Sequence, residues 1–133
     1  MAPPLPKVNL SEPGWTVRQG QAVWHPGRGA QEIAGELLVA ARRDGPAFVQ
    51  FTKTPFPLVE AQTTVNRWTV EFPPQDKRYS GRGAPPARLL WFELARVLAG
   101  LPLPKNWVWK NSETGWRLEN SSTGEFLQGY FTQ

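Results

Sequence analysis

The amino-acid sequence predicts an α+β fold: a curved antiparallel sheet that forms an open half-barrel, with one main helix packed across its concave face. Most of the chain alternates apolar and polar residues with the two-residue period of a β-strand. One segment near residue 90 instead repeats apolar residues at the spacing of an amphipathic helix. Short turns separate these segments, and short turns join antiparallel neighbours. A sheet that curls in this way encloses an apolar interior.

The length of the chain limits it to one folded domain, because 133 residues suffice for a single core. We expect the proline-rich residues 1–14 to form a flexible linker and residues 15–133 to form the domain. The first residues lack the apolar core of a signal peptide, and no stretch approaches the ~20 apolar residues of a membrane span.

The first half of the domain has the pattern of successive strands. The strongest alternation covers residues 32–43, and Asp44-Gly45 then predicts a tight hairpin into residues 48–53. Prolines on both sides of Phe56 are expected to interrupt the pairing. A weaker pattern precedes these strands and others follow, at residues 15–31, 59–64 and 67–72, and residues 73–83 are expected to be loop with a short extended piece around Tyr79.

The one convincing helix is expected over about residues 85–99, because prolines favour a first helical turn and Gly100 followed by Pro102 ends it. Its wide apolar face comprises Ala87, Leu90, Trp91, Leu94, Val97 and Leu98, and Leu89 and Phe92 add apolar surface outside that face. Such a helix either packs into a core or covers an apolar cavity. Three short strands are expected after it, over residues 106–110, 115–119 and 125–131.

The residue types that are missing exclude several kinds of site. The chain has no Cys, which excludes disulfides, thiolate nucleophiles and cysteine-bound zinc. His25 is the only histidine, so no site that needs two imidazoles can form. Four glutamates that could in principle act as acid and base fall on separate expected strands, namely Glu36, Glu60, Glu71 and Glu125. We therefore expect no catalytic residue, no metal and no cofactor, and an enzyme is the least supported class.

The chain is mildly basic, with 15 Lys and Arg against 11 Asp and Glu and a formal net charge of +4. The basic residues are scattered, and the tightest group comprises Lys77, Arg78, Arg82 and Arg88. Such a group is typical of a solvated loop, and it also suits contact with anionic lipid head groups or nucleic acid.

The order of features over residues 33–107 resembles the LolA/LolB superfamily of bacterial lipoprotein carriers and receptors, and LolB more than LolA. The resemblance begins with the hairpin Gly35-Glu36-Leu37-Leu38-Val39-Ala40 to Phe48-Val49-Gln50-Phe51. It continues through the loop Thr54-Pro55-Phe56-Pro57-Leu58, two further strands, Lys77-Arg78-Tyr79 and the helix. It ends at the helix exit Gly100-Leu101-Pro102-Leu103-Pro104 and the following Trp107.

This resemblance implies a non-enzymatic protein whose apolar cavity takes acyl chains of lipoproteins or another hydrophobic ligand. It implies a periplasmic or outer-membrane-associated location, with an anionic membrane surface as a further partner. In LolB-like proteins an apolar side chain protrudes from the loop that matches Pro55, Phe56, Pro57 and Leu58 here and helps to deliver the cargo. The family also has a second lid helix after the helix exit, where this chain has a strand pattern over residues 106–110. The cavity is therefore expected to be shallower than in the family.

The apolar faces of the expected strands and helix supply the candidate cavity lining. These residues are Leu37, Val39, Val49, Phe51, Trp68, Val70, Leu90, Trp91, Leu94 and Leu98. The same residues fit a second hypothesis, in which seven Trp side chains help to fill the interior and the protein is a structural or protein-interaction module. A third hypothesis is single-strand nucleic-acid binding by aromatic stacking. We expect no nucleic acid as a partner, because the aromatic residues share faces with Leu and Val as core residues do.

Overall fold

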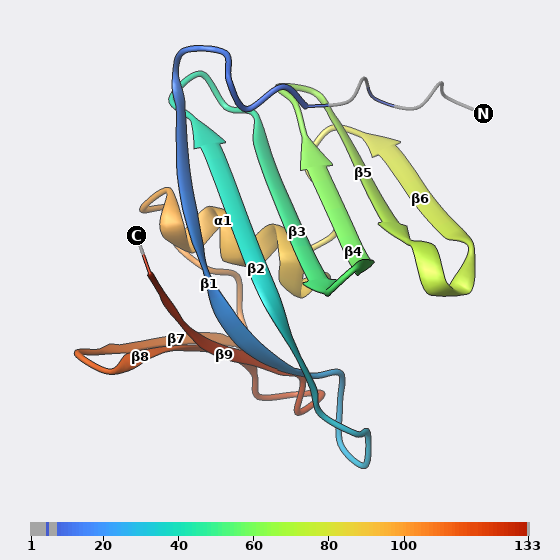
Figure 1. Cartoon of the computed structure of the whole chain (residues 1–133), viewed down its shortest axis with the longest axis vertical. Helices are drawn as coiled ribbons and strands as arrows, with labels where there is room; N and C mark the ends of the chain where they lie inside the picture. Colours follow the sequence, from blue (N-terminus) through green and yellow to red (C-terminus); the bar gives the residue numbers. More distant parts are fainter. Residues whose placement is uncertain (1–4, 6–7, 133) are drawn as a thin grey trace.

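The computed structural model of the chain describes residue 5 and residues 8–132. Its described residues form one antiparallel sheet of nine strands with the spatial order β6-β5-β4-β3-β2-β1-β9-β8-β7. The strands are β1 (Trp15–His25), β2 (Ile33–Arg42), β3 (Ala47–Lys53), β4 (Phe56–Thr63), β5 (Arg67–Phe72), β6 (Lys77–Arg82), β7 (Trp107–Ser112), β8 (Gly115–Asn120) and β9 (Phe126–Phe131). The sheet is curved and does not close, and the helix α1 (Leu90–Leu98) lies behind it in the view of Figure 1.

The sequence prediction of a mostly antiparallel sheet with one helix is confirmed. The tight turn at Asp44-Gly45 is also present, since Gly45 has a φ of +117° and its N–H donates to the carbonyl of Arg42. A positive φ of this kind suits glycine, which has no Cβ to clash with the backbone. The segment expected to be a strand over residues 106–110, where the family has a second helix, is β7.

The segment over residues 73–83, expected to be loop with a short extended piece around Tyr79, is more regular than predicted. A short 3₁₀ turn (Pro73–Gln75) leads into β6, which pairs along its length with β5. The ring of Tyr79 packs edge-on to Phe72 at 6.3 Å between centroids, and Arg78 forms a 2.7 Å ion pair with Glu71. This strand lies at the edge of the sheet and is mostly exposed, so its sequence lacks the apolar alternation of a half-buried strand.

The helix begins five residues later than predicted. Leu89 has an extended backbone, with φ −93° and ψ 112°, and serves as the N-cap residue. The residues before it form a turn whose Ala87 carbonyl accepts a 2.7 Å hydrogen bond from the indole of Trp107. The predicted end is confirmed, because Gly100 adopts φ +80° just beyond the last helical turn.

An aromatic cluster fills the space between the middle of the sheet and α1. The ring of Trp91 lies 5.5 Å from that of Phe51 and 5.1 Å from that of Trp24. Trp91 is only 1% exposed. Burial of a large aromatic side chain contributes about 1.5–3 kcal/mol, so this cluster is a principal attachment of the helix to the sheet.

Strand β1 joins the two parts of the sheet, since it pairs with β2 on one side and with β9 on the other. Figure 1 shows β7, β8 and β9 running across the lower end of β1 at a steep angle to β2 and β3. Two glycines permit the close crossing. A Cβ added to Gly20 would lie 1.9 Å from the carbonyl oxygen of Tyr130, and one added to Gly129 would lie 2.1 Å from that of Gln21.

The linker expected over residues 1–14 lies partly outside the described residues, which omit 1–4 and 6–7. Its last residues form turns, in which the N–H of Glu12 donates to the carbonyl of Asn9. A carboxylate oxygen of Glu12 lies 3.6 Å from the guanidinium of Arg42, so these turns contact the end of β2.

Candidate functional site: a pocket between the sheet and the end of the helix

A pocket of about 760 Å³ lies between the sheet and the C-terminal half of α1, and we call it the helix pocket. Small-molecule sites commonly have volumes of about 300–1,000 Å³. Its apolar lining comes from the sheet, from the helix and from the turns between strands. These residues are Val39, Ala41, Ala47, Val65, Ala84, Pro85, Phe92, Ala95, Leu98, Ala99 and Leu101.

The pocket exists because small side chains meet where the helix and the sheet come together. Ala41 and Ala47 are direct partners in the pairing of β2 with β3. Ala95 and Ala99 are four residues apart on the helical segment and so project from the same side of it. Larger residues at these four positions would close the gap that their methyl groups leave.

Two exposed apolar side chains belong to the lining as well. Val65, in the turn between β4 and β5, is 82% exposed, and Leu101, just after the helix, is 51% exposed. The pocket is therefore open to solvent beside an apolar surface.

The polar part of the lining is basic. Arg18, Arg42, Arg43 and Arg96 line the pocket together with Thr16, Thr63, Thr64 and Asn66, and no Asp or Glu does so. The guanidinium of Arg42 lies 3.0 Å from the carboxylate of Asp44, and that of Arg96 donates a 2.9 Å hydrogen bond to the carbonyl of Pro102. Arg18 stacks on the ring of Phe131, with 4.4 Å from its guanidinium carbon to the ring centroid.

Of the ten residues that the sequence suggested as cavity lining, Val39 and Leu98 line the helix pocket. The other eight, Leu37, Val49, Phe51, Trp68, Val70, Leu90, Trp91 and Leu94, belong to the packed core or pack against it. Trp68 is half-buried and lies edge-on to Phe92 at 5.9 Å. Because Trp24, Phe51 and Trp91 occupy the middle of the interior, the open space lies toward one end of it.

The loop expected at Pro55, Phe56, Pro57 and Leu58 is shorter than predicted. Only Thr54 and Pro55 form the turn, through a cis peptide bond, and β4 begins at Phe56. Phe56 pairs with Lys53 and is 68% exposed. The turn lies at the opposite end of β4 from Val65, away from the helix pocket (Figure 1).

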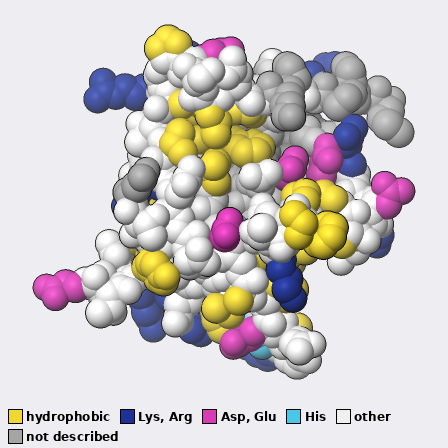
Figure 2. Space-filling model, in the orientation of Figure 1, with side chains coloured by type: hydrophobic (Ala, Val, Ile, Leu, Met, Phe, Trp, Pro, Cys, Tyr) yellow, Lys and Arg dark blue, Asp and Glu magenta, His cyan; other side chains and the backbone are white. Residues whose placement is uncertain are grey.

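The face of the sheet turned away from α1 also carries apolar side chains. Figure 2 shows them gathered over the upper parts of β2 and β3. On this face Leu38 and Phe48 are half-buried and Ala40 is fully buried between its partners on β1 and β3.

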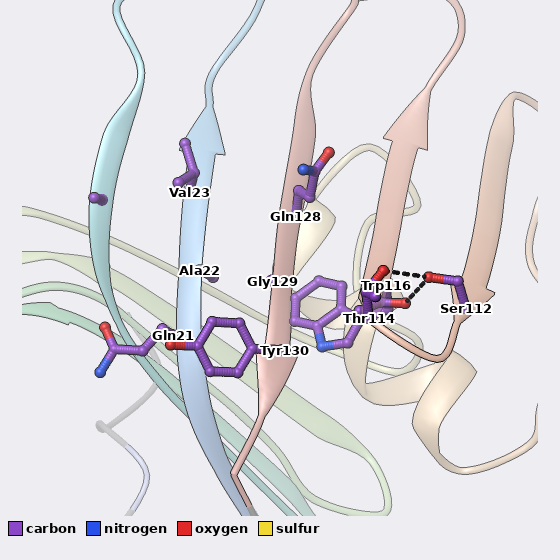
Figure 3. A pocket seen from close by; sticks show the side chains of 11 residues that line it. Gln21, Ala22, Val23, Ser112, Thr114, Trp116, Gln128, Gly129 and Tyr130 are labelled. Atoms are coloured by element: carbon purple, nitrogen blue, oxygen red, sulfur yellow. Dashed lines mark hydrogen bonds between the residues drawn. The ribbon is translucent and has the colours of Figure 1, made fainter.

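A smaller hollow of about 410 Å³ crosses β1, β9 and β8, and Figure 3 shows its side chains. Tyr130 and Gln21 project on one side of it, and Ser112 on the other bonds to Thr114 and to the carbonyl of Gly115. No charged residue lines the hollow, so it offers only neutral hydrogen-bonding groups and backbone.

Two of the four glutamates named from the sequence come together. Glu60 and Glu71 are direct partners across β4 and β5. Each has a neighbour of its own, because the amide of Gln50 donates a 2.9 Å hydrogen bond to Glu60 and Arg78 pairs with Glu71. Arg78 thus balances the charge of Glu71, and Gln50 donates to one carboxylate oxygen of Glu60.

Glu125 lies apart from that pair, directly before β9. Its carboxylate accepts a 3.0 Å hydrogen bond from the indole N–H of Trp24. Burial raises the pKa of Glu125 to about 7, against a smaller opposing effect of that hydrogen bond. Burial likewise raises the pKa of Glu93 in α1, where the nearby Arg96 acts in the opposite direction.

His25 ends β1 with its imidazole stacked on Phe126, at 5.0 Å between centroids. In the part of the chain that the structure describes, its Nδ1 is buried without a hydrogen-bond partner. In the same part of the chain, no three acidic or imidazole side chains are grouped as metal ligands, and no helix is long and apolar enough to span a membrane.

No family model matches the chain, and no curated protein matches it significantly. The basic lining of the helix pocket was not anticipated from the sequence. One sign of it was present in β1. Thr16, Arg18, Ala22 and Trp24 lie on the same face of this strand, and the first two are polar although the last two are apolar.

Proposed function

We propose that the protein is a non-enzymatic binder of an acyl chain or another hydrophobic ligand, held in the helix pocket. In this proposal the sheet and the helix act as an open half-barrel that shelters the ligand. The observation that carries the proposal is the pocket of about 760 Å³ formed where alanine side chains of the sheet and the helix meet.

An apolar pocket of this kind needs no catalytic group to hold its ligand. Transfer of an acyl chain from water contributes about 0.8 kcal/mol for each buried CH₂. Val39, Phe92 and Leu98 supply the apolar surface, and the exposed Leu101 extends it at the entrance. A chain of several carbons would therefore bind through its methylene groups alone.

The resemblance to lipoprotein carriers supports an extension of this proposal, in which the acyl chain is that of a lipoprotein and the protein acts in the periplasm or at the outer membrane. The exposed ring of Phe56 is available for contact with a cargo or a membrane in that role. The basic residues Lys77 and Arg82 on the exposed edge strand suit an anionic membrane surface.

The proposal is tested by filling the pocket. We expect Ala41→Phe to weaken binding of a fluorescent fatty acid by tenfold or more, because the added ring occupies the space between β2 and the helix. The measurement is a fluorescence titration of delipidated protein, with circular dichroism to verify folding. Ala87→Phe is the matched control, since Ala87 is exposed and lies outside the pocket lining. Absence of saturable binding to the unaltered protein would disprove the proposed function.

A second candidate function is a structural or protein-interaction module with a filled interior. The packing of Trp24, Phe51 and Trp91 favours it, since these rings occupy the centre of the interior. The two functions differ in one measurement. A module of this kind would show no saturable binding of the fatty acid, and Ala41→Phe would then change no binding property.

A further inference from the structure

We propose that the ligand of the helix pocket is an amphiphile with an anionic head group, a carboxylate or a phosphate, and that Arg18 and Arg43 bind this head group. The inference rests on the proposed function and adds to it the chemical class of the ligand. An uncharged hydrophobic ligand would need no cationic side chains beside its pocket.

The charge of the lining is the first observation. Four arginines and no acidic residue line the helix pocket, although the chain as a whole has 15 basic against 11 acidic residues. A lining drawn evenly from the charged residues would include carboxylates. The pocket is therefore much more basic than the rest of the molecule, and a cationic rim attracts anions.

The partners of the four arginines divide them into two pairs. Arg42 is neutralised by Asp44, at 3.0 Å, and Arg96 lies beside the buried carboxylate of Glu93, at 3.8 Å. These two arginines have local structural partners.

Arg18 and Arg43 have no carboxylate partner among the described residues. Arg18 rests on the face of Phe131, which leaves its N–H groups without an acidic neighbour. Arg43 forms no hydrogen bond or ion pair with any residue that the structure describes. Their charges are thus available to a ligand.

The pairing of β1 with β2 places Arg18 on the pocket side, and the turn after β2 brings Arg43 into the same lining. Arg18 is opposite Val39 and Thr16 is opposite Ala41, while Arg43 comes two residues after Ala41 in the chain. Val39 and Ala41 face the same way because side chains alternate between the faces of a sheet, and Arg43, in the turn that follows β2, lines the same pocket. Arg18 and Arg43 thus belong to the same pocket lining as Ala41.

This arrangement suits a ligand with two parts. Its chain would lie over Ala41 and Ala95 against Phe92, and its head group would lie at the rim within reach of Arg18 and Arg43. Guanidinium groups bind carboxylates and phosphates through paired, charge-assisted hydrogen bonds. The shared chemistry of the head group is its negative charge, and both a fatty acid and a phosphorylated lipid carry it.

The test compares four ligands with one chain length: decanoate, decyl phosphate, decanol and decyltrimethylammonium, each titrated below micelle formation by calorimetry at pH 8. We expect decanoate or decyl phosphate to bind at least fivefold more tightly than decanol, and the cationic ligand to bind most weakly. The stronger of the two anions identifies the carboxylate or the phosphate as the head group.

Two variants then assign the residues. Arg18→Gln and Arg43→Gln are each expected to weaken binding of the preferred anion by about twofold to fivefold, the range of partly exposed ion pairs, and to leave decanol unchanged. The control is Arg88→Gln, which removes the same charge from an exposed residue outside the pocket.

The outcomes separate this inference from the proposed function. Equal binding of decanoate, decyl phosphate and decanol overturns the inference and leaves the acyl-chain function standing. Binding of none of the four ligands overturns both. An effect of Arg88→Gln as large as that of Arg18→Gln also overturns the assignment, because it would reflect the net charge of the protein instead of the pocket.

Discussion

At the scale of single residues, the burial of Glu125, whose carboxylate accepts a hydrogen bond from Trp24, couples folding to pH. These residues are 101 positions apart in the chain, and their contact joins β1 to the residue directly before β9. Burial raises the pKa of Glu125 from 4.5 to about 7. The native state therefore holds a proton that the unfolded chain releases at lower pH.

The sign of the effect follows from this difference. Below about pH 4.5 both states are protonated, and the contribution to stability is fully present. As the pH rises to about 7 it is progressively lost, because the unfolded state then binds fewer protons than the native state. We expect the free energy of unfolding to fall by on the order of 2–3 kcal/mol across this range.

Replacement of Glu125 by Gln should remove most of this slope, since the amide oxygen can still accept the hydrogen bond of Trp24 and carries no charge. Urea unfolding at several pH values between 4.5 and 8 provides the measurement. Glu113→Gln, at an exposed turn position, serves as the comparison. A slope in Glu125→Gln as steep as in the unaltered protein would show that another group is responsible, with the buried Glu93 as the next candidate.

At the scale of elements, the helix depends on the aromatic side chain that it buries in the sheet. Trp91 contacts both Phe51 and Trp24, and these contacts lie on two different strands. Removal of the indole leaves a cavity that the surrounding strands cannot collapse to fill.

We expect Trp91→Ala to lower the free energy of unfolding by about 3–5 kcal/mol, the usual cost of such a truncation. Trp109→Ala, at a less buried position on β7, should cost clearly less. Chemical denaturation followed by circular dichroism would compare the two. Equal losses would argue against the central position of Trp91 in the core.

The close approach of β9 to its neighbour β1 makes a separate demand on the sequence. Gly129→Ala places a methyl group 2.1 Å from the carbonyl oxygen of Gln21, which is backbone and cannot rotate away. We expect a loss of at least about 1–3 kcal/mol, as for overpacking elsewhere. Gly27→Ala is the control, because its nearest contact would be 3.7 Å from the carbonyl of Thr123. A thermal melt that shifts equally for both variants would contradict this explanation.

The sequence predicted best those elements in which alternating apolar and polar residues indicate the buried face. Strand β2 was predicted to within a residue at each end, because Leu37 and Val39 face the core and its turn carries the typical Asp44-Gly45 pair. Strand β6 was predicted only as a short extended piece around Tyr79 within a loop, since an edge strand pairs through its backbone and leaves few apolar residues as a sign. The helix was predicted to start too early, because a proline such as Pro85 is common in a first helical turn. In the structure the backbone of Leu89 is still extended.

The candidate site was predicted only in part for a related reason. Periodicity identifies the residues that face the interior, such as Phe51 and Val70, but it does not say which of them are tightly packed. The pocket arises where Ala47 of a strand and Ala95 of the helix meet, and that meeting depends on the tertiary arrangement. The sequence likewise gave no indication that Arg43, just after β2, lines the pocket.

At the scale of the whole molecule, the nine described strands form one hydrogen-bonded sheet, but side chains fill the space beneath it unevenly. Its centre is filled by aromatic rings, and the open volume lies at one end, between the turns of the sheet and the end of α1. The open volume is thus separate from the aromatic packing that attaches the helix to the strands.

The position of β1 in the sheet has a consequence for the order in which the chain can assemble. Gly20 of β1 pairs with Phe131 of β9, so one edge of β1 has no partner until β9 is present. During synthesis β1 can pair with β2 as soon as both have left the ribosome, while its other edge stays unpaired until β9 has been made. Pairing between such distant segments is slow because closing a long loop costs conformational entropy. The newly made chain thus passes through a stage with an exposed strand edge, at which a chaperone or a neighbouring chain would compete with β9 for the same backbone groups.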